Sequence, residues 1–110
     1  MALTLANITF DCADPAKLGA FWSAALDQRT AADSNEFFTR IEGVPNWFFI
    51  KVPEPKASKN RNHVDLHADD RDLEVARLEA LGATVDGHHD EWGIQWTVMN
   101  DPEGNEFCVS

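Results

Sequence analysis

The sequence is short of basic residues. Nine lysines and arginines stand against nineteen aspartates and glutamates in 110 residues, which gives a formal net charge of −10. A chain this acidic repels a phosphate backbone instead of attracting it. We therefore expect no nucleic-acid partner.

Long apolar runs are also missing. No stretch approaches the roughly 20 consecutive apolar residues that a membrane-spanning helix needs. The opening residues, MALTLANITF, lack the charged start and the long apolar core of a secretory signal. The expectation is a cytoplasmic protein with no membrane partner.

Cysteine is scarce as well. Cys12 and Cys108 are the only two, and they form no CxxC pattern. Two cysteines are too few to hold a secreted fold together by disulfides. We expect both to be reduced thiols.

What the sequence does contain is an alternation of apolar and polar residues, followed by a helical pattern. Ile8 and Phe10 alternate with polar neighbours, as in a strand with one buried face. Asp14 can cap the helix that follows and Pro15 suits its first turn, while apolar residues recur at the helical period up to residue 26. Three further strands are predicted at residues 28–34, 36–41 and 46–52.

The second half repeats this order. A strand in NHVDLHA is followed by a helix that begins with a capping aspartate and ends at Gly82, and then by strands at 83–89, 94–100 and 105–110. Aligning the halves places Asn7 on His63 and Asp11 on His67. We predict one domain over 1–110, with module one at 1–52, an exposed linker at 53–61 and module two at 62–110.

This two-copy order, together with HVDLHADD, LEALGA and DPEGNEFCV, resembles the vicinal oxygen chelate superfamily of glyoxalases, bleomycin resistance proteins and dioxygenases, and within it the small glyoxalase-like branch. The resemblance covers the whole chain. It implies an α+β fold of two tandem βαβββ modules, whose curved mixed sheets form a cavity and whose helices lie outside. It also implies a homodimer.

Polar residues on the strand faces away from the helices are candidates for the wall of that cavity. The alternative is that they form the solvated side of an ordinary sheet. Phe48 and Ile50 share a strand face and would make part of the wall apolar, while Trp47 and Trp96 could pack the sheet or stack on a flat ligand. We expect His63 to be buried in the pocket and His67 to lie toward its rim. The polar candidates are Asn7, Thr9, Asp11, His63, Asp65, His67, Glu106 and Cys108.

The metal ligands that the resemblance implies fall on Asn7, Ile50, His63 and Cys108, and only His63 is a standard match. Isoleucine cannot coordinate a metal, and an asparagine amide is a weak ligand for a transition metal. We predict no metal and no cofactor. A replacement site made by His63, Glu106 and Cys108 stays open as the alternative.

Without a metal, His63 and Glu106 could move protons on a substrate, and Cys108 could be a nucleophile if His63 lowered its pKa. Each could instead be a structural residue. Two functions follow. The first is a small-molecule-binding protein in which any catalysis is metal-independent, and the alternative is a metal-dependent lyase, isomerase or dioxygenase-type enzyme of the same superfamily.

Overall fold

The computed structural model describes residues 3–110, and the chain divides into two compact units, Met1–Lys56 (unit one) and Ala57–Ser110 (unit two). The boundary falls inside the segment predicted as a linker. Each unit contains one helix and one mixed sheet, with three strands in unit one and four in unit two. The predicted α+β class with two βαβββ-type modules is confirmed.

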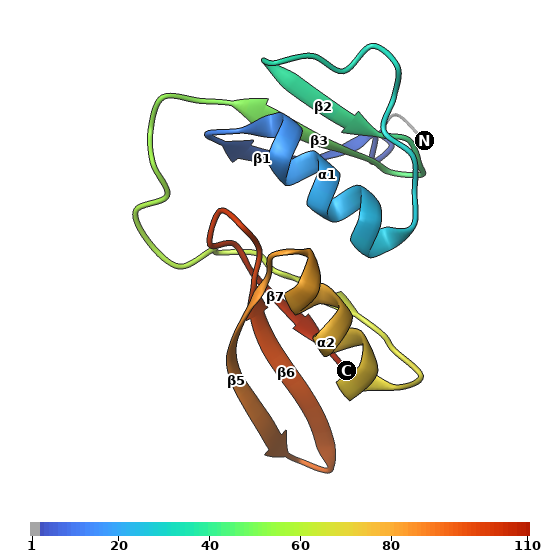
Figure 1. Ribbon diagram of the computed structural model, residues 1–110, viewed down its shortest axis with the longest axis vertical. Helices are drawn as coiled ribbons and strands as arrows, with labels where there is room; N and C mark the ends of the chain where they lie inside the picture. Colours follow the sequence, from blue (N-terminus) through green and yellow to red (C-terminus); the bar gives the residue numbers. More distant parts are fainter. Residues whose placement is uncertain (1–2) are drawn as a thin grey trace. The chain divides into compact units, whose positions relative to one another are not determined.

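Unit one contains β1 (Asn7–Cys12), α1 (Pro15–Leu26), β2 (Phe38–Ile41) and β3 (Asn46–Lys51). The sheet order is β1-β3-β2, with β1 parallel to β3 and β2 antiparallel to it. Figure 1 shows α1 lying across one face of this sheet. One face of the sheet is therefore buried against α1, and the other face is not covered by this helix.

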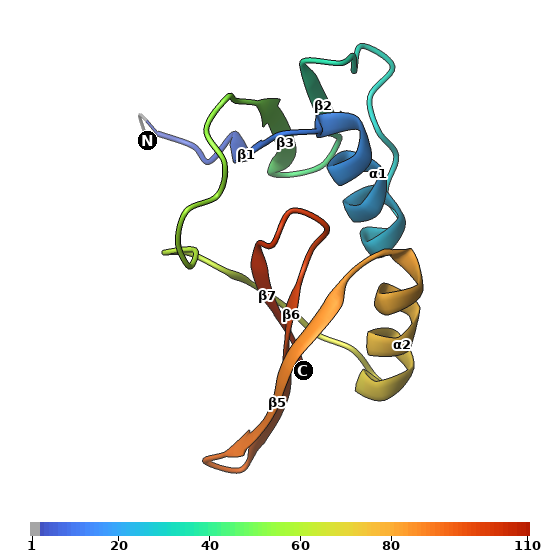
Figure 2. The same ribbon diagram turned by 60° about the vertical axis from the view of Figure 1, so that its left-hand side comes forward.

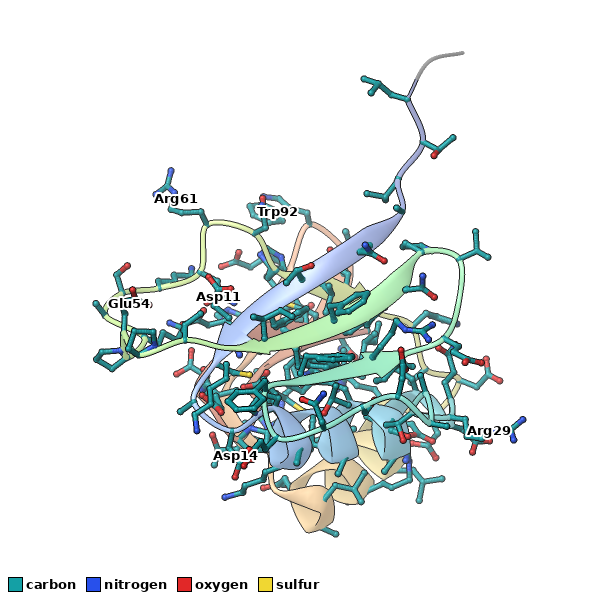
Figure 3. The ribbon with its side chains drawn as sticks, turned by 90° about the horizontal axis from the view of Figure 1, so that it is seen from above. Asp11, Asp14, Arg29, Glu54, Arg61 and Trp92 are labelled. Atoms are coloured by element: carbon teal, nitrogen blue, oxygen red, sulfur yellow. The ribbon has the colours of Figure 1, made fainter. Side chains whose placement is uncertain are left out.

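The start of α1 is fixed by the residues that the sequence indicated. The Asp14 carboxylate accepts a hydrogen bond from the Lys17 backbone N–H at 3.1 Å, and Pro15 occupies the first turn, where its missing N–H costs nothing. Figure 3 shows Asp14 at this end of the helix. The predicted cap is confirmed.

Aromatic rings fill the core of unit one. Trp22 from α1 lies 6.1 Å from Phe10 and 5.1 Å from Trp47, measured between ring centroids, and Phe10 lies 5.4 Å from Phe49. Trp22 and Phe49 are fully buried. Of the two roles considered for Trp47, packing the sheet is therefore the one observed.

The strand predicted at 28–34 does not form. This segment runs beside β2 and makes two backbone hydrogen bonds to it, Ala31 N–H to Arg40 C=O and Glu42 N–H to Arg29 C=O, but only one isolated bridge, between Thr30 and Ile41. The left-handed backbone of Asp27 (φ 52°) ends α1 just before it. Without a run of alternating apolar residues, nothing holds the segment in a longer ladder.

Unit two contains β4 (Val64–Leu66), α2 (Arg71–Leu81), β5 (Thr84–Glu91), β6 (Ile94–Asn100) and β7 (Glu106–Val109). The sheet order is β4-β7-β6-β5, with β4 parallel to β7 and the other pairs antiparallel. The last strand of each unit therefore lies parallel to the first. This is the internal repeat that the sequence pattern predicted.

The ends of α2 also follow the sequence. The Asp70 carboxylate accepts a hydrogen bond from the Leu73 backbone N–H at 3.1 Å, and Gly82, with φ 120°, ends the helix in a conformation that favours glycine. The core of unit two combines residues from α2 with one face of its sheet. Its buried side chains include Val75, Leu78, Thr97, Met99, Phe107 and Val109.

Neither helix among residues 3–110 is long and apolar enough to cross a membrane. The two contain 12 and 11 residues, whereas a single crossing takes about 20.

Candidate functional site

The register of unit two brings side chains from four strands onto one face, and the predicted candidates among them come from β4, β6 and β7. Asp65 in β4 is the partner of Cys108 in β7, and Cys108 is the partner of Val98 in β6. Partners in neighbouring strands point to the same side of a sheet. The neighbours of Cys108 along β7, Phe107 and Val109, are buried on the other side. We call the free side the open face of unit two, and it comprises Asp65, His89, Trp96, Val98, Asn100, Glu106 and Cys108.

Three side chains at the β4 and β7 side of this face lie close together. His63, Asp65 and Cys108 each offer a potential ligand atom, and all three atoms lie within 4.8 Å of one another. His63 Nε2 is 3.4 Å from Asp65 Oδ1. We call these three residues the His63 cluster. It is the only group of its kind among residues 3–110.

The His63 cluster is more exposed than the sequence predicted. The side chain of His63 is 48% exposed and that of Asp65 73% exposed. His63 precedes the first residue of β4, so it stands at the margin of the sheet and not within it. The expectation of a buried His63 is wrong for this chain. A half-exposed side chain in this position is accessible to solvent and to a small molecule.

Cys108 is a protonated thiol in this setting. Burial raises the pKa of the Cys108 thiol, and the charge of Asp65 together with a hydrogen bond to its side chain raises it further, while the nearby charge of Lys59 lowers it. A raised pKa leaves less thiolate, and the thiolate is the nucleophile. The hypothesis that a neighbour activates Cys108 by lowering its pKa is therefore wrong in sign. Burial and Asp65 together outweigh Lys59, the one charge that lowers the pKa of this thiol.

Glu106 lies on the open face but outside the His63 cluster. Its Oε2 accepts a hydrogen bond from the backbone N–H of Asn60 at 2.8 Å, which fastens the segment before β4 to β7. The structure thus puts Asp65, and not Glu106, beside His63 and Cys108. A catalytic role for Glu106 stays a prediction, and its observed contact is a structural one.

His67 lies two residues beyond Asp65, just past the end of β4. Its side chain is 81% exposed, and its Nε2 is 3.6 Å from Asp69 Oδ1. It makes no contact with the His63 cluster in the part of the chain that the structure describes. A place at the rim of a pocket stays a prediction, and the exposure of His67 makes it a useful control for His63.

In unit one, the face of the sheet away from α1 carries the remaining candidates. Phe48 is the register partner of Thr9, and Ile50 is the partner of Asp11, so these four side chains share a face. The ring of Phe48 lies 6.1 Å from that of Phe38 on the neighbouring strand. Phe48 and Ile50 therefore share a face, as predicted, and their role in the wall of a cavity stays a prediction.

Asn7 lies at the end of this face of unit one. Its Oδ1 accepts a hydrogen bond from Asn46 Nδ2 at 3.3 Å. A carbonyl oxygen that accepts from another amide has one lone pair fewer to offer a ligand. Ligand binding by Asn7 stays a prediction.

The β5–β6 hairpin carries a group of residues that sequence reasoning missed. The rings of His89 and Trp96 stack at 5.0 Å with 13° between their planes, and Trp92 stacks on Trp96 at 6.1 Å with 10° between planes. His88 points to the other face, where its Nδ1 is 2.8 Å from Thr97 Oγ1. Folding the sequence about the Trp92-Gly93 turn would have paired His89 with Trp96. This was the available signal.

A wide, open hollow of about 1060 Å³ lies in unit one between α1 and the segment that follows it. Its lining includes Ala20, Ser23 and Thr39. None of the residues predicted for the site belongs to it. The hollow is shaped by small side chains on α1 and brings no cluster of reactive groups together.

Comparisons with known proteins agree on the fold. A family model described as a glyoxalase-like domain matches residues 7–110. Among solved structures, a glyoxalase/bleomycin resistance protein/dioxygenase family enzyme from Burkholderia phytofirmans PsJN is similar at 16% identity and a TM-score of 0.81, over 97% of each chain. A lactoylglutathione lyase from Agrobacterium tumefaciens is similar at 18% identity and a TM-score of 0.67, over 94% of this chain and 90% of its own.

A third similar structure is the fosfomycin resistance protein FosX from Listeria monocytogenes, in a complex with Mn(II) and a dihydroxypropylphosphonic acid. It is 13% identical with a TM-score of 0.79, over 99% of this chain and 89% of its own. A search of curated proteins finds no match. At these identities the likeness to solved structures concerns the fold alone, since one fold hosts many activities.

Proposed function

Because the chain belongs to the glyoxalase-like domain family, we propose that it binds a small molecule against the open face of unit two, with any catalysis independent of a metal ion. The observation that carries this proposal is the His63 cluster. Its imidazole, carboxylate and thiol converge within 4.8 Å on the same sheet face that carries Trp96. A few convergent polar groups beside apolar and aromatic surface are typical of small-molecule sites.

The three polar groups would have different roles toward a ligand. The protonated thiol of Cys108 donates its weak hydrogen bond to the Asp65 carboxylate, which has further lone pairs to accept a hydrogen bond from a ligand. An imidazole can take up or give up a proton near neutral pH, so His63 is the residue of this cluster suited to general acid or base chemistry. Asp65 Oδ1, 3.4 Å from His63 Nε2, would hold the imidazole in place. Any catalysis therefore depends on His63.

The test compares the two histidines that flank β4. A library of small molecules is screened by thermal shift, in which a ligand at 100 times its Kd adds about 2.7 kcal/mol to the stability of the folded state. The best ligand is then titrated against His63→Ala and His67→Ala. We expect His63→Ala to weaken binding about tenfold, because it removes one hydrogen-bonding partner, and His67→Ala to leave binding unchanged. Equal affinities in the two variants would overturn the proposal.

A metal-dependent lyase or isomerase is the second candidate, and the same cluster favours it. Imidazole, carboxylate and thiolate are suitable ligands for zinc and similar divalent ions, and His63, Asp65 and Cys108 would hold such an ion. A bound ion would act as a Lewis acid toward a substrate oxygen. Against this candidate stand the raised pKa of Cys108 and the residues Asn7 and Ile50 at two expected ligand positions.

Metal analysis separates the two candidates. We expect the purified protein to carry no stoichiometric transition metal after dialysis, measured by elemental analysis. As a second readout, titration with Co(II) should give no absorption from a thiolate–cobalt bond. About one metal ion per chain, lost in a Cys108→Ser variant, would establish the metal-dependent candidate instead.

A further inference from the structure

The β5–β6 hairpin extends beyond the rest of its sheet. Strand β7 pairs with β6 only over Thr97–Asn100, so the part of the hairpin from His89 to Trp96 has no third strand beside it. Figures 1 and 2 both show this two-stranded end projecting past β7. A two-stranded ribbon has little core of its own, so aromatic side chains on it are not there to fill a core.

Three parallel rings lie on this ribbon, and we call them the hairpin aromatic stack: His89, Trp92 and Trp96. The planes of His89 and Trp92 are tilted by only 13° and 10° from that of Trp96. Trp92 is nevertheless 84% exposed, and Figure 3 shows its side chain at the outer surface. A large part of the indole is therefore free to receive another flat ring.

The turn holds Trp92 in an unusual backbone conformation. Trp92 has φ 54° and Gly93 has φ 73°, between the paired residues Glu91 and Ile94. Positive φ at both central residues defines a type I′ turn, in which asparagine, aspartate and glycine are preferred. Tryptophan there adds conformational strain to the exposure of an apolar ring. Strain of this kind at an exposed residue points toward function.

The surroundings of the hairpin aromatic stack are acidic. The hairpin carries Asp86, Asp90 and Glu91, and no lysine or arginine follows Arg77 in the sequence. Asp90 accepts a hydrogen bond from Gln95, while Glu91 is exposed. Anions are repelled here, and a cation gains both from these charges and from the negative face of the indole rings.

We propose that the hairpin aromatic stack is a binding platform for a planar aromatic cation, with the ring of the ligand stacked on the exposed Trp92, next to Trp96, and the charge balanced by Glu91 and its acidic neighbours. The inference rests on the proposed function, because Trp96 belongs to the same open face as the His63 cluster. It adds the chemical class of the ligand, which the His63 cluster alone does not define.

The experiment uses three flat bicyclic probes of similar size: 1-methylquinolinium as the cation, quinoline as the neutral ring and naphthalene-2-sulfonate as the anion. Binding to the full chain is measured by calorimetry and by the indole N–H signals in NMR. We expect the cation to bind about tenfold more tightly than quinoline, as a cation–π contribution allows, and the anion not to bind. The signals of Trp92 and Trp96 should move, while that of buried Trp22 stays.

Variants locate the binding. Trp92→Asn removes the ring and places a residue that the turn prefers, so the hairpin should remain folded. It should weaken binding of the cation about tenfold, and Glu91→Gln should weaken it severalfold. Phe37→Ala, at a ring that is 61% exposed in unit one, is the matched control and should change nothing. Equal binding of 1-methylquinolinium to Trp92→Asn and to the parent chain, or no binding to either, would overturn the platform.

The two proposals fail separately. If quinoline binds as tightly as the cation, the proposed ligand class is wrong, and if Trp92→Asn only lowers the melting temperature, the stack is structural. The proposed function still stands in that case if His63→Ala weakens binding of a screened ligand relative to His67→Ala. Loss of the His63 effect with retention of the Trp92 effect would leave the platform as a binding site of its own.

Discussion

At the scale of single residues, the chemistry of the open face depends on which neighbour controls Cys108. Burial, the charge of Asp65 and a hydrogen bond to it all favour the protonated thiol, against a smaller opposite effect of Lys59. His63 lies close enough to be a rival influence, since its ligand atom is within 4.8 Å of the thiol. Sequence spacing identifies these neighbours but not the sign of their combined effect on the pKa.

We predict that Cys108 reacts slowly with iodoacetamide at neutral pH. Its rate should rise only at a pH higher than that at which an ordinary thiol ionises, because only the thiolate reacts and the pKa of Cys108 is raised. Asp65→Asn removes the negative charge, so it should lower the pKa and speed the reaction at neutral pH. The rates are followed by mass spectrometry of the cysteine-containing peptides.

Two controls belong to this experiment. Lys59→Met removes the one charge that lowers the pKa, so it should slow the reaction further. Cys12 is only 3% exposed and should stay unmodified in the folded protein, which reports on unfolding. A rate in Asp65→Asn equal to that of the parent chain would show that Asp65 does not control the thiol.

At the scale of elements, the sequence predicted most of the fold because its signals were local. Caps at Asp14 and Asp70, the glycine at position 82 and the alternation in β1 and β4 all act within a few residues of where they stand. The segment 28–34 was predicted as a strand because turn-forming residues separate it from the next short run, but it forms only a single isolated bridge to β2.

The candidate site was predicted less completely than the fold. The position of His63 beside Cys108 followed from the family resemblance, but the choice between Asp65 and Glu106 depended on register and on the hydrogen bond from Asn60. A register is a relation between distant segments, and the sequence of one strand does not contain it. The stacking of His89 on Trp96 was missed for another reason, since folding the chain about the Trp92-Gly93 turn is enough to pair these two residues.

The contact of α1 with β2 provides a test of packing at the same scale. Gly19 is buried in α1, and a β-carbon there would lie 2.8 Å from Thr39 Cβ and closer still to Thr39 Cγ2. Gly19→Ala gains helix propensity of about 1 kcal/mol but overpacks the interface at a cost of about 1 to 3 kcal/mol. We expect a net loss of stability of about 1 kcal/mol, measured by urea unfolding.

The double variant Gly19→Ala with Thr39→Ala is the control for this packing. It removes the clash with Thr39 Cγ2 but keeps the close approach of Thr39 Cβ. The stability lost by adding Gly19→Ala to the Thr39→Ala protein should therefore be smaller than the loss caused by Gly19→Ala in the parent chain. Non-additive effects are expected for residues in direct contact. A more stable Gly19→Ala protein would mean that α1 and β2 are less closely packed than described.

At the scale of the whole molecule, both units leave large apolar side chains in water. In unit one these are Leu3, Leu5, Phe37 and Val44, each more than 60% exposed, and in unit two they include Trp92 and Ile94. Scattered apolar residues are normal on a surface, but a chain of 110 residues has little core with which to offset their exposure. Association with a second copy is a common way to cover such surface.

We therefore predict a homodimer, of about twice the 12.3 kDa mass of one chain, in sedimentation velocity at micromolar concentration. Each chain carries a formal charge of −10, so the two copies repel one another and the repulsion is screened by salt. Raising the sodium chloride concentration should then strengthen the dimer, because burial of apolar surface does not weaken with screening. An interface held by ion pairs would instead weaken as salt is added. A 12.3 kDa species at every salt concentration would contradict the predicted homodimer, and the exposed apolar residues would then not serve to join two copies.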